Sequence, residues 1–538
     1  MHTDNTLPDQ DSASLQPEDD KRKDHMESET ISDEDFRKLI EKRARTLLGL
    51  ANYLSQCPSS NQILIRPLLG ELHSQSAQIE ELLDAYNARN NCTWCPFRSV
   101  TAAVKLFSDV SYELLHIWHV LPAYRLLSIE SDFVEATKQT LTFTGDTLLS
   151  AAKQLLARAK ELKLAVPAES AREESYVEEL PPGRLSYKCR ARKVETVAET
   201  VTSMATAFLN LAAESRDVRA AGKAKPDRYD DFLASAIREE NLRSLQLRFH
   251  NLQSLYDTYL SGTETEERDD DLVVLRGHIS VVFHLLTIAT LFAHYYERHM
   301  DTQPCKSPTR QNPLVKQQQL LAVLMNYCVK YISLYIAGAE NLCRQKLKQY
   351  AEIIQLQVSV PRYRGFHVRP STLISKLILH YGSSVQMQLE GQTYDAGIPL
   401  VLFRANEQIN AQKRRWLAAE IERLKLNRQD CQDKDITAVV RGIVLTLAEQ
   451  GKVILYEQPL QISDQIIADE SSLFETVCDE VATLLALGKI DINTDLTATF
   501  IGDKRVLTDI QLLANSGYGE DNFGNNIPLP DKLRYLRL

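Results

Sequence analysis

Glycine and proline are scarce in this 538-residue chain, which holds 19 of each. Fibrous and low-complexity proteins need far more of both, so this scarcity excludes those classes and favours long helices. Aromatic residues reach only 7%, yet 44% of the chain is apolar and 25% is charged, which is ordinary for a globular protein with a sizeable core. The length suggests three or four domains.

The chain also lacks an excess of positive charge. Residues 1–35 hold twelve acids and three bases, so they carry −9 of the net −10 and leave −1 for the rest. A near-neutral body has no positive field for non-specific nucleic-acid binding, so we expect no nucleic-acid partner. The acidic tail is predicted to be disordered, either as a solubilising leader or as an intramolecular lid over a basic site.

Nine scattered cysteines, an odd number, do not indicate a disulfide framework. No apolar run near the start resembles a signal peptide. The stretch 279–296 is long enough to cross a bilayer, but it stands alone and contains His284 and His294. It therefore predicts a buried bundle helix rather than membrane insertion, and we expect a cytoplasmic protein.

Apolar residues from 36 to 350 recur at helical spacing, as in Ile40, Ala44, Leu47, Ala51 and Leu54. Asp33 is the predicted N-cap of the first helix. Further helices are expected over 61–89, 97–122, 129–163, 192–217, 228–260, 271–299 and 313–352. These segments predict one antiparallel bundle, or two stacked bundles split near the proline-containing stretch 164–188.

The pattern changes after residue 350, where strands and helices mix. Residues 353–360 and 385–389 alternate in strand fashion, Gly391 marks a hairpin, and 371–380 is a predicted helix. Helices are expected over 403–427, 435–450 and 470–487, with strands at 453–456 and 497–502. The predicted fold class is therefore α+β multidomain, with domains at 36–350, 351–460 and 461–538 after the tail.

The six residues 365–370 read Gly-Phe-His-Val-Arg-Pro, between a predicted strand and a predicted helix. Gly365 permits a tight turn, and Pro370 suits the first turn of a helix. His367 then lies just before a helix N-terminus, where free N–H groups and the helix dipole favour an anion. Arg369 adds donors that match phosphate oxygens. This set suits a histidine nucleophile that accepts and holds a phosphoryl group.

The order strand, motif, helix, strand, glycine turn and strand over about 353–402 resembles the histidine-containing phosphocarrier (HPr) family of the bacterial sugar phosphotransferase system. The family pattern is Gly-Leu-His-x-Arg-Pro. The resemblance implies an α/β open-faced sandwich whose His367 is phosphorylated by enzyme I, using phosphoenolpyruvate, and then passes the group to another protein. It also implies that Arg369 steadies the phosphoryl group and that the protein needs no cofactor. Additional contacts to phosphate are expected at Arg364, Val368, Pro370 and Ser371.

Some positions depart from the family pattern. Phe366 replaces leucine, and Val368 stands where a small residue is typical. The family's regulatory serine aligns near Ile398 or Pro399, so we expect no regulation by a serine kinase. A charged helix is predicted where the fourth strand should follow residue 403. Either 435–456 completes the sheet differently, or the domain is a remodelled relative.

Other motifs are weaker. Cys92 and Cys95 with His116 and His119 have a spacing compatible with zinc, although a helix start is the favoured interpretation. Histidines 278, 284, 294 and 299 lie on one predicted helix without a partner Glu-x-x-His pair, so we expect buried or surface histidines. The glycine-rich acidic loop 517–525 is predicted to be a surface loop, with a partner or cation site as the alternative.

Two main hypotheses remain. The first is a bacterial phosphocarrier that receives the group from an enzyme I-like donor and gives it to an unknown protein. The second is a non-phosphorylated scaffold or regulator with an HPr-like docking domain. A zinc or thiol regulator using Cys92 and Cys95 is a third. No Walker loop, kinase signature or HExxH motif suggests a turnover enzyme.

Overall fold

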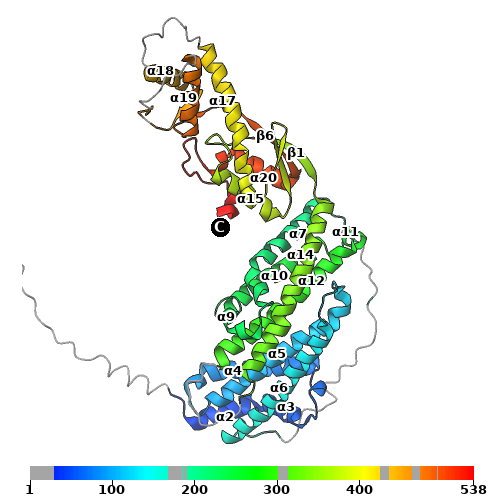
Figure 1. The fold of residues 1–538 in the computed structure, drawn as a ribbon. Coiled ribbons are helices and arrows are strands. Elements are labelled where there is room, and N and C mark those ends of the chain that lie inside the picture. The colour runs from blue at the N-terminus through cyan, green and yellow to red at the C-terminus, as the bar shows by residue number, and fades with distance from the viewer. Residues whose placement is uncertain are drawn as a thin grey trace, which may run out of the picture.

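The computed structural model describes residues 30–167, 185, 191–300, 313–424, 436–457, 459–462, 473–493 and 495–537. Most of these residues are helical, and a small antiparallel sheet accompanies them, so the chain is α+β overall as predicted (Figure 1). The acidic tail predicted to be disordered over 1–35 lies outside the described residues up to position 29, and its last residues, 33–35, are helical instead.

The first part of the chain is all helical. Its helices are α2 (Asp33–Arg43), α3 (Arg45–Gln56), α4 (Arg66–Ala85), α5 (Cys95–Tyr124), α6 (Phe133–Glu161), α7 (Val197–Glu214), α8 (Arg216–Ala221), α9 (Tyr229–Leu233), α10 (Glu239–Tyr259), α11 (Glu264–Arg268), α12 (Asp270–Tyr295), α13 (Gln317–Val323) and α14 (Lys330–Tyr350). Two π-helical turns, Tyr296–Met300 and Leu324–Val329, follow α12 and α13.

The apolar spacing and capping residues in the sequence predicted most of these helices, but the structure corrects some of their ends. Ser32, not the predicted Asp33, is the N-cap of α2, because its backbone is extended and its hydroxyl accepts from Asp35 N at 3.1 Å. The helix expected over 228–260 is broken before α10, where Arg238 adopts an extended conformation. The single helix expected over 313–352 is α13, a π-helical turn and α14.

The helices on both sides of 164–188 share one hydrophobic core, which extends from Phe36 to Leu347. Phe107 of α5 and Phe292 of α12 meet in it, with ring centroids 6.3 Å apart. The helices before and after 164–188 therefore form one continuous apolar interior.

Two segments are long and apolar enough to cross a membrane by length and composition, Asp270–Met300 and Gln317–Tyr350. In the structure 67% and 61% of their apolar windows are buried inside the protein. Their packing in the common core matches the buried bundle helix predicted at 279–296.

The second part of the chain mixes strands and helices. Its elements are β1 (Ile353–Ser359), α15 (Val368–Tyr381), β2 (Val385–Leu389), β3 (Gln392–Asp395), α16 (Pro399–Arg404), α17 (Asn406–Arg423), α18 (Ile436–Glu449), β4 (Val453–Leu455), α19 (Leu473–Ala486), β5 (Ile490–Ile492), β6 (Thr497–Asp503) and α20 (Lys504–Asn515).

Four of the strands form one antiparallel sheet in the order β1-β6-β2-β3. Phe500 of β6 pairs with Leu356 of β1 and Met387 of β2. One face of β2 is buried, with Val385, Met387 and Leu389 in a core shared with α15 and α20. This alternation is typical of a sheet whose helices cover one side.

This pairing corrects two predictions. The strand predicted at 497–502 is the fourth strand of the sheet, so 435–456 does not complete it. The predicted boundary between 460 and 461 is also wrong, because β6 lies between β1 and β2 and shares their core. The chain leaves this sheet unit after α16 and returns at β6.

The described residues of 406–493, here called the inserted unit, have a second core that begins at Leu417, while Ile409 at the start of α17 still packs in the core of the sheet unit. Helices α17, α18 and α19 pack with the two-stranded sheet β4-β5, in which Val453 pairs with Ile492. Figure 1 shows α17 running from the sheet unit toward α18 and α19. The inserted unit is therefore a compact addition to the sheet unit.

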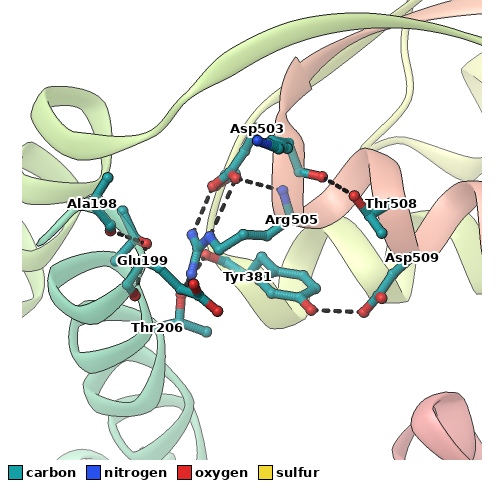
Figure 2. Close-up of polar contacts among 11 residues, drawn as sticks. Ala198, Glu199, Thr206, Tyr381, Asp503, Arg505, Thr508 and Asp509 are labelled. Atoms are coloured by element: carbon teal, nitrogen blue, oxygen red, sulfur yellow. Dashed lines mark hydrogen bonds and ion pairs between the residues drawn. The ribbon is translucent and has the colours of Figure 1, made fainter. Parts of the chain in front are cut away.

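Helix α7 of the bundle contacts the sheet unit (Figure 2). Thr206 Oγ1 donates to Tyr381 O at 3.1 Å, at the C-terminal end of α15. Arg505 lies against buried Asp503, with Nη2 2.6 Å from Oδ2, and its Nη1 is 3.4 Å from Thr206 Oγ1. Tyr381 OH in turn donates to Asp509 Oδ2 at 2.6 Å. These contacts fix the end of α15 that is farther from His367.

Candidate functional site

His367 is the N-cap of α15, as the motif predicted. Its backbone is extended, and its carbonyl accepts the first helical bond from Ser371 N at 3.2 Å. Helix geometry leaves the N–H groups of Val368 and Arg369 without intrahelical partners, and Pro370 has no N–H to satisfy. The start of α15 is therefore a place that favours negative charge.

The His367 ring lies between two oxygen acceptors. Its Nε2 is 3.1 Å from Glu520 Oε2, and its Nδ1 is 3.2 Å from Gly365 O. The side chain is only 20% exposed, and the Tyr363 ring meets it edge-on at 5.3 Å. The phosphocarrier hypothesis calls for an exposed ring near the backbone N–H groups of α15, and the low exposure of this ring counts against it. Because a neutral imidazole carries one N–H, only one of the two acceptors can receive a hydrogen bond from it.

Glu520 reaches the ring from the loop after α20. The side chain is 3% exposed, and its Oε1 is buried with no hydrogen-bond partner among the described residues. Tyr518 holds this loop, since its buried ring is next to Phe366 and its OH donates to Ser359 O at 2.5 Å. The loop predicted to be plain surface thus supplies a buried carboxylate to the candidate site.

The two predicted arginines lie in different surroundings. Arg369 Nη1 donates to Gly519 O at 3.3 Å, so its guanidinium is beside the residue that precedes Glu520. Arg364 turns to the inserted unit, where its Nη2 donates to Gly488 O at 3.2 Å. Arg369 therefore lies beside the loop that carries Glu520, while Arg364 contacts the inserted unit.

The other three residues predicted to contact phosphate, Val368, Pro370 and Ser371, differ in their exposure to solvent. Val368 is 74% exposed, and Pro370 is buried. Ser371 is 1% exposed, and its hydroxyl donates to Phe366 O at 2.8 Å. The Ser371 hydroxyl therefore stabilises the loop before His367.

The zinc interpretation is wrong. Cys95 and His116 lie on the single helix α5, so 21 residues of helix separate them by about 30 Å. His116 instead lies beside His284, with ring centroids 4.3 Å apart, and its Nε2 is 3.5 Å from Tyr124 OH. Among the residues that the structure describes, no group of three or more His, Cys, Asp or Glu side chains is arranged to hold a metal ion.

Two of the histidines on α12 contact neighbouring segments. His278 is buried, with Nε2 3.1 Å from Leu127 N and Nδ1 2.9 Å from Tyr335 O. His284 pairs with Glu113 at 2.7 Å. Both join α12 to neighbouring segments of the bundle.

Three residues of the site were not predicted: Glu520, Asn406 and Asp491. Asn406 Oδ1 accepts from Phe366 N at 2.8 Å, and Asp491 Oδ2 accepts from Arg364 N at 3.0 Å. Asn406 lies 40 residues from Phe366, Asp491 lies 127 residues from Arg364, and Glu520 is farther still from His367, so no local spacing in the sequence marks these residues.

In comparisons with protein-family models, curated proteins and solved structures, nothing matches this chain.

Proposed function

We propose that this protein is a phosphoryl carrier in which His367 accepts and donates the group in a phosphotransferase-type relay or its regulation. The observation that carries the proposal is a histidine at the N-cap of α15 whose Nε2 lies 3.1 Å from the buried carboxylate of Glu520. A carboxylate that accepts from Nε2 fixes the proton there and leaves the lone pair of the neutral ring on Nδ1. Nδ1 is then the nucleophile.

For phosphoryl transfer the protein mainly has to position the reacting groups and stabilise the negative charge of the phosphoryl oxygens. The Nδ1 lone pair attacks the phosphorus of a phosphohistidine on an enzyme I-like donor. The N–P bond of the donor breaks, and its electron pair returns to the donor's imidazole. Arg369 and the first amides of α15 then face the phosphoryl oxygens. Delivery to the acceptor protein repeats the same exchange.

Before it reacts, Nδ1 has to leave Gly365 O, which lies 3.2 Å away. With the proton on Nε2, Nδ1 carries no N–H and makes no hydrogen bond to this carbonyl, so turning away from it breaks none. The antiparallel order β1-β6-β2-β3, with α15 and α20 in one core on one face, also supports the open-faced sandwich implied by the resemblance.

The alternative is a scaffold whose histidine stays unphosphorylated. It is favoured by one specific observation, the low 20% exposure of the His367 side chain with an oxygen beside each ring nitrogen. On this hypothesis the ring is a structural link between the loop before α15 and the loop after α20.

Incubation of the full chain with enzyme I and labelled phosphoenolpyruvate separates the two. The relay predicts acid-labile label on the wild type and none on His367→Ala. The matched control is His119→Ala, which changes an exposed histidine on α5 and should leave labelling unchanged. Label that persists in His367→Ala rules out this residue as the acceptor. A wild type that takes no label contradicts the relay and favours the scaffold.

A further inference from the structure

We propose that the inserted unit positions His367, with Asn406 and Asp491 as positioning residues that act through the preceding loop. The kinetic part of this inference rests on the proposed function, whereas the structural part does not. Neither residue contacts the imidazole, so their effect passes through the backbone of residues 363–366.

The loop before the histidine has an unusual backbone. Arg364 and Gly365 are both left-handed, with φ of +52° and +62°. A residue with a side chain adopts this conformation at a cost, so neighbouring groups have to hold it. Asp491 does so, because its Oδ2 accepts from Arg364 N at 3.0 Å.

Asp491 is itself fixed within the inserted unit. Its side chain is 3% exposed, and Oδ1 lies 2.5 Å from Lys413 Nζ, which is 4% exposed. The same oxygen accepts from Ile492 N at 2.7 Å. A buried carboxylate with a cation and two backbone donors has little freedom to move, so the Arg364 amide is held by a rigid partner.

Asn406, the first residue of α17, holds the next peptide. Its Oδ1 accepts from Phe366 N at 2.8 Å, and Phe366 is fully buried. A Cβ added to Gly365 would overlap the same oxygen. The loop and the start of the inserted unit are therefore in direct contact, with no room for a side chain at Gly365.

The hydrogen bond from Phe366 N to Asn406 orients the Gly365 carbonyl, which lies beside the His367 ring. Phe366 N–H and Gly365 C=O belong to one planar peptide, so fixing the N–H on Asn406 fixes the direction of the C=O. Gly365 O accepts from His367 N at 2.8 Å and lies 3.2 Å from Nδ1. The inserted unit thereby sets where the ring nitrogen rests.

An aromatic contact adds to the hydrogen bonds. Tyr456 of the inserted unit meets the Tyr363 ring edge-on at 5.2 Å, and Tyr363 meets His367 in the same way at 5.3 Å. Burial raises the pKa of Tyr456, so its hydroxyl stays neutral beside the site. Four successive residues before His367 thus contact one compact unit, and a shift of that unit will be transmitted to the ring.

The test compares Asn406→Ala with Asn406→Asp, which keeps an acceptor oxygen. The control is Asn326→Ala, which removes a comparable hydrogen bond from Tyr229 OH, 2.7 Å long, in the helical bundle. The readout is the Cε1–Hε1 signal of His367 in the full chain labelled with ¹³Cε1-histidine, assigned by its loss in His367→Gln. We expect the signal to move in Asn406→Ala, to stay in Asn326→Ala and to return toward the wild type in Asn406→Asp.

Phosphorylation by enzyme I gives the second readout. We expect the initial rate to fall about tenfold in Asn406→Ala and to stay unchanged in the control. A His367 signal that does not move in folded Asn406→Ala overturns the inference. If the wild type takes no label but the signal moves as expected, the proposed relay fails while the positioning role stands.

Discussion

Replacing Gly365 with alanine tests the central contact of the site. The residue has φ of +62°, and an added Cβ would overlap Asn406 Oδ1. The left-handed backbone costs an alanine about 1–2 kcal/mol. Displacing Asn406 leaves the buried Phe366 N–H without its acceptor, which costs about 1–3 kcal/mol more. We therefore expect Gly365→Ala to destabilise the sheet unit by about 2–5 kcal/mol.

Gly391→Ala is the matched control, because it shares the backbone strain and lacks the overlap. Its φ is +79°, and an added Cβ would meet nothing within 4 Å. The control should cost only the backbone part, about 1–2 kcal/mol. The difference between the two variants, about 1–3 kcal/mol, then measures the contact with Asn406.

Hydrogen exchange of the full chain, followed by mass spectrometry, suits this comparison because it reports each unit separately. Peptides from β1 and β6 should exchange about 5- to 150-fold faster in Gly365→Ala than in Gly391→Ala, while helical-bundle peptides serve as the internal reference. In an Asn406→Gly background the excess cost should disappear. Equal exchange rates in the two alanine variants would refute the claim that Gly365 packs against Asn406.

Three further outcomes follow from the structure. Glu520→Ala should slow phosphorylation of His367 by about tenfold or more in the enzyme I assay, and Glu520→Gln less, because only the amide keeps an acceptor for Nε2; equal rates in the two variants would contradict this. Burial, aided by His294 and Arg98, lowers the pKa of His299 to about 3, so the neutral ring stabilises the fold above pH 6.5 and this contribution is lost as the pH falls toward 3. In calorimetry His299→Phe should flatten the dependence of Tm on pH between about pH 3 and 6.5. An unchanged slope would contradict the contribution assigned to His299. Lys346→Met should cost about 3–5 kcal/mol in urea unfolding, because it leaves buried Asp269 without the ammonium 2.7 Å away, whereas exposed Lys348→Met should cost little.

Much of the local structure could be predicted from sequence alone. The apolar spacing at Ile40, Leu47 and Leu54 predicted helices, and the alternation at Val385 and Met387 predicted a strand. These signals succeed because a helix or strand buries one face at a fixed period within a short window. In the same way, the turn and capping chemistry of residues 365–370 placed His367 at the start of a helix.

What surrounds His367 was decided only by tertiary structure. Glu520, Asn406 and Asp491 reach the site from distant segments, and β6 enters the sheet after an excursion of about ninety residues. Strand order depends on which edges meet in space, and no periodic pattern encodes a partner so far along the chain. The sequence therefore determined which residue stands at the head of α15, while the assembled units decided how far its ring is covered and which oxygens face it.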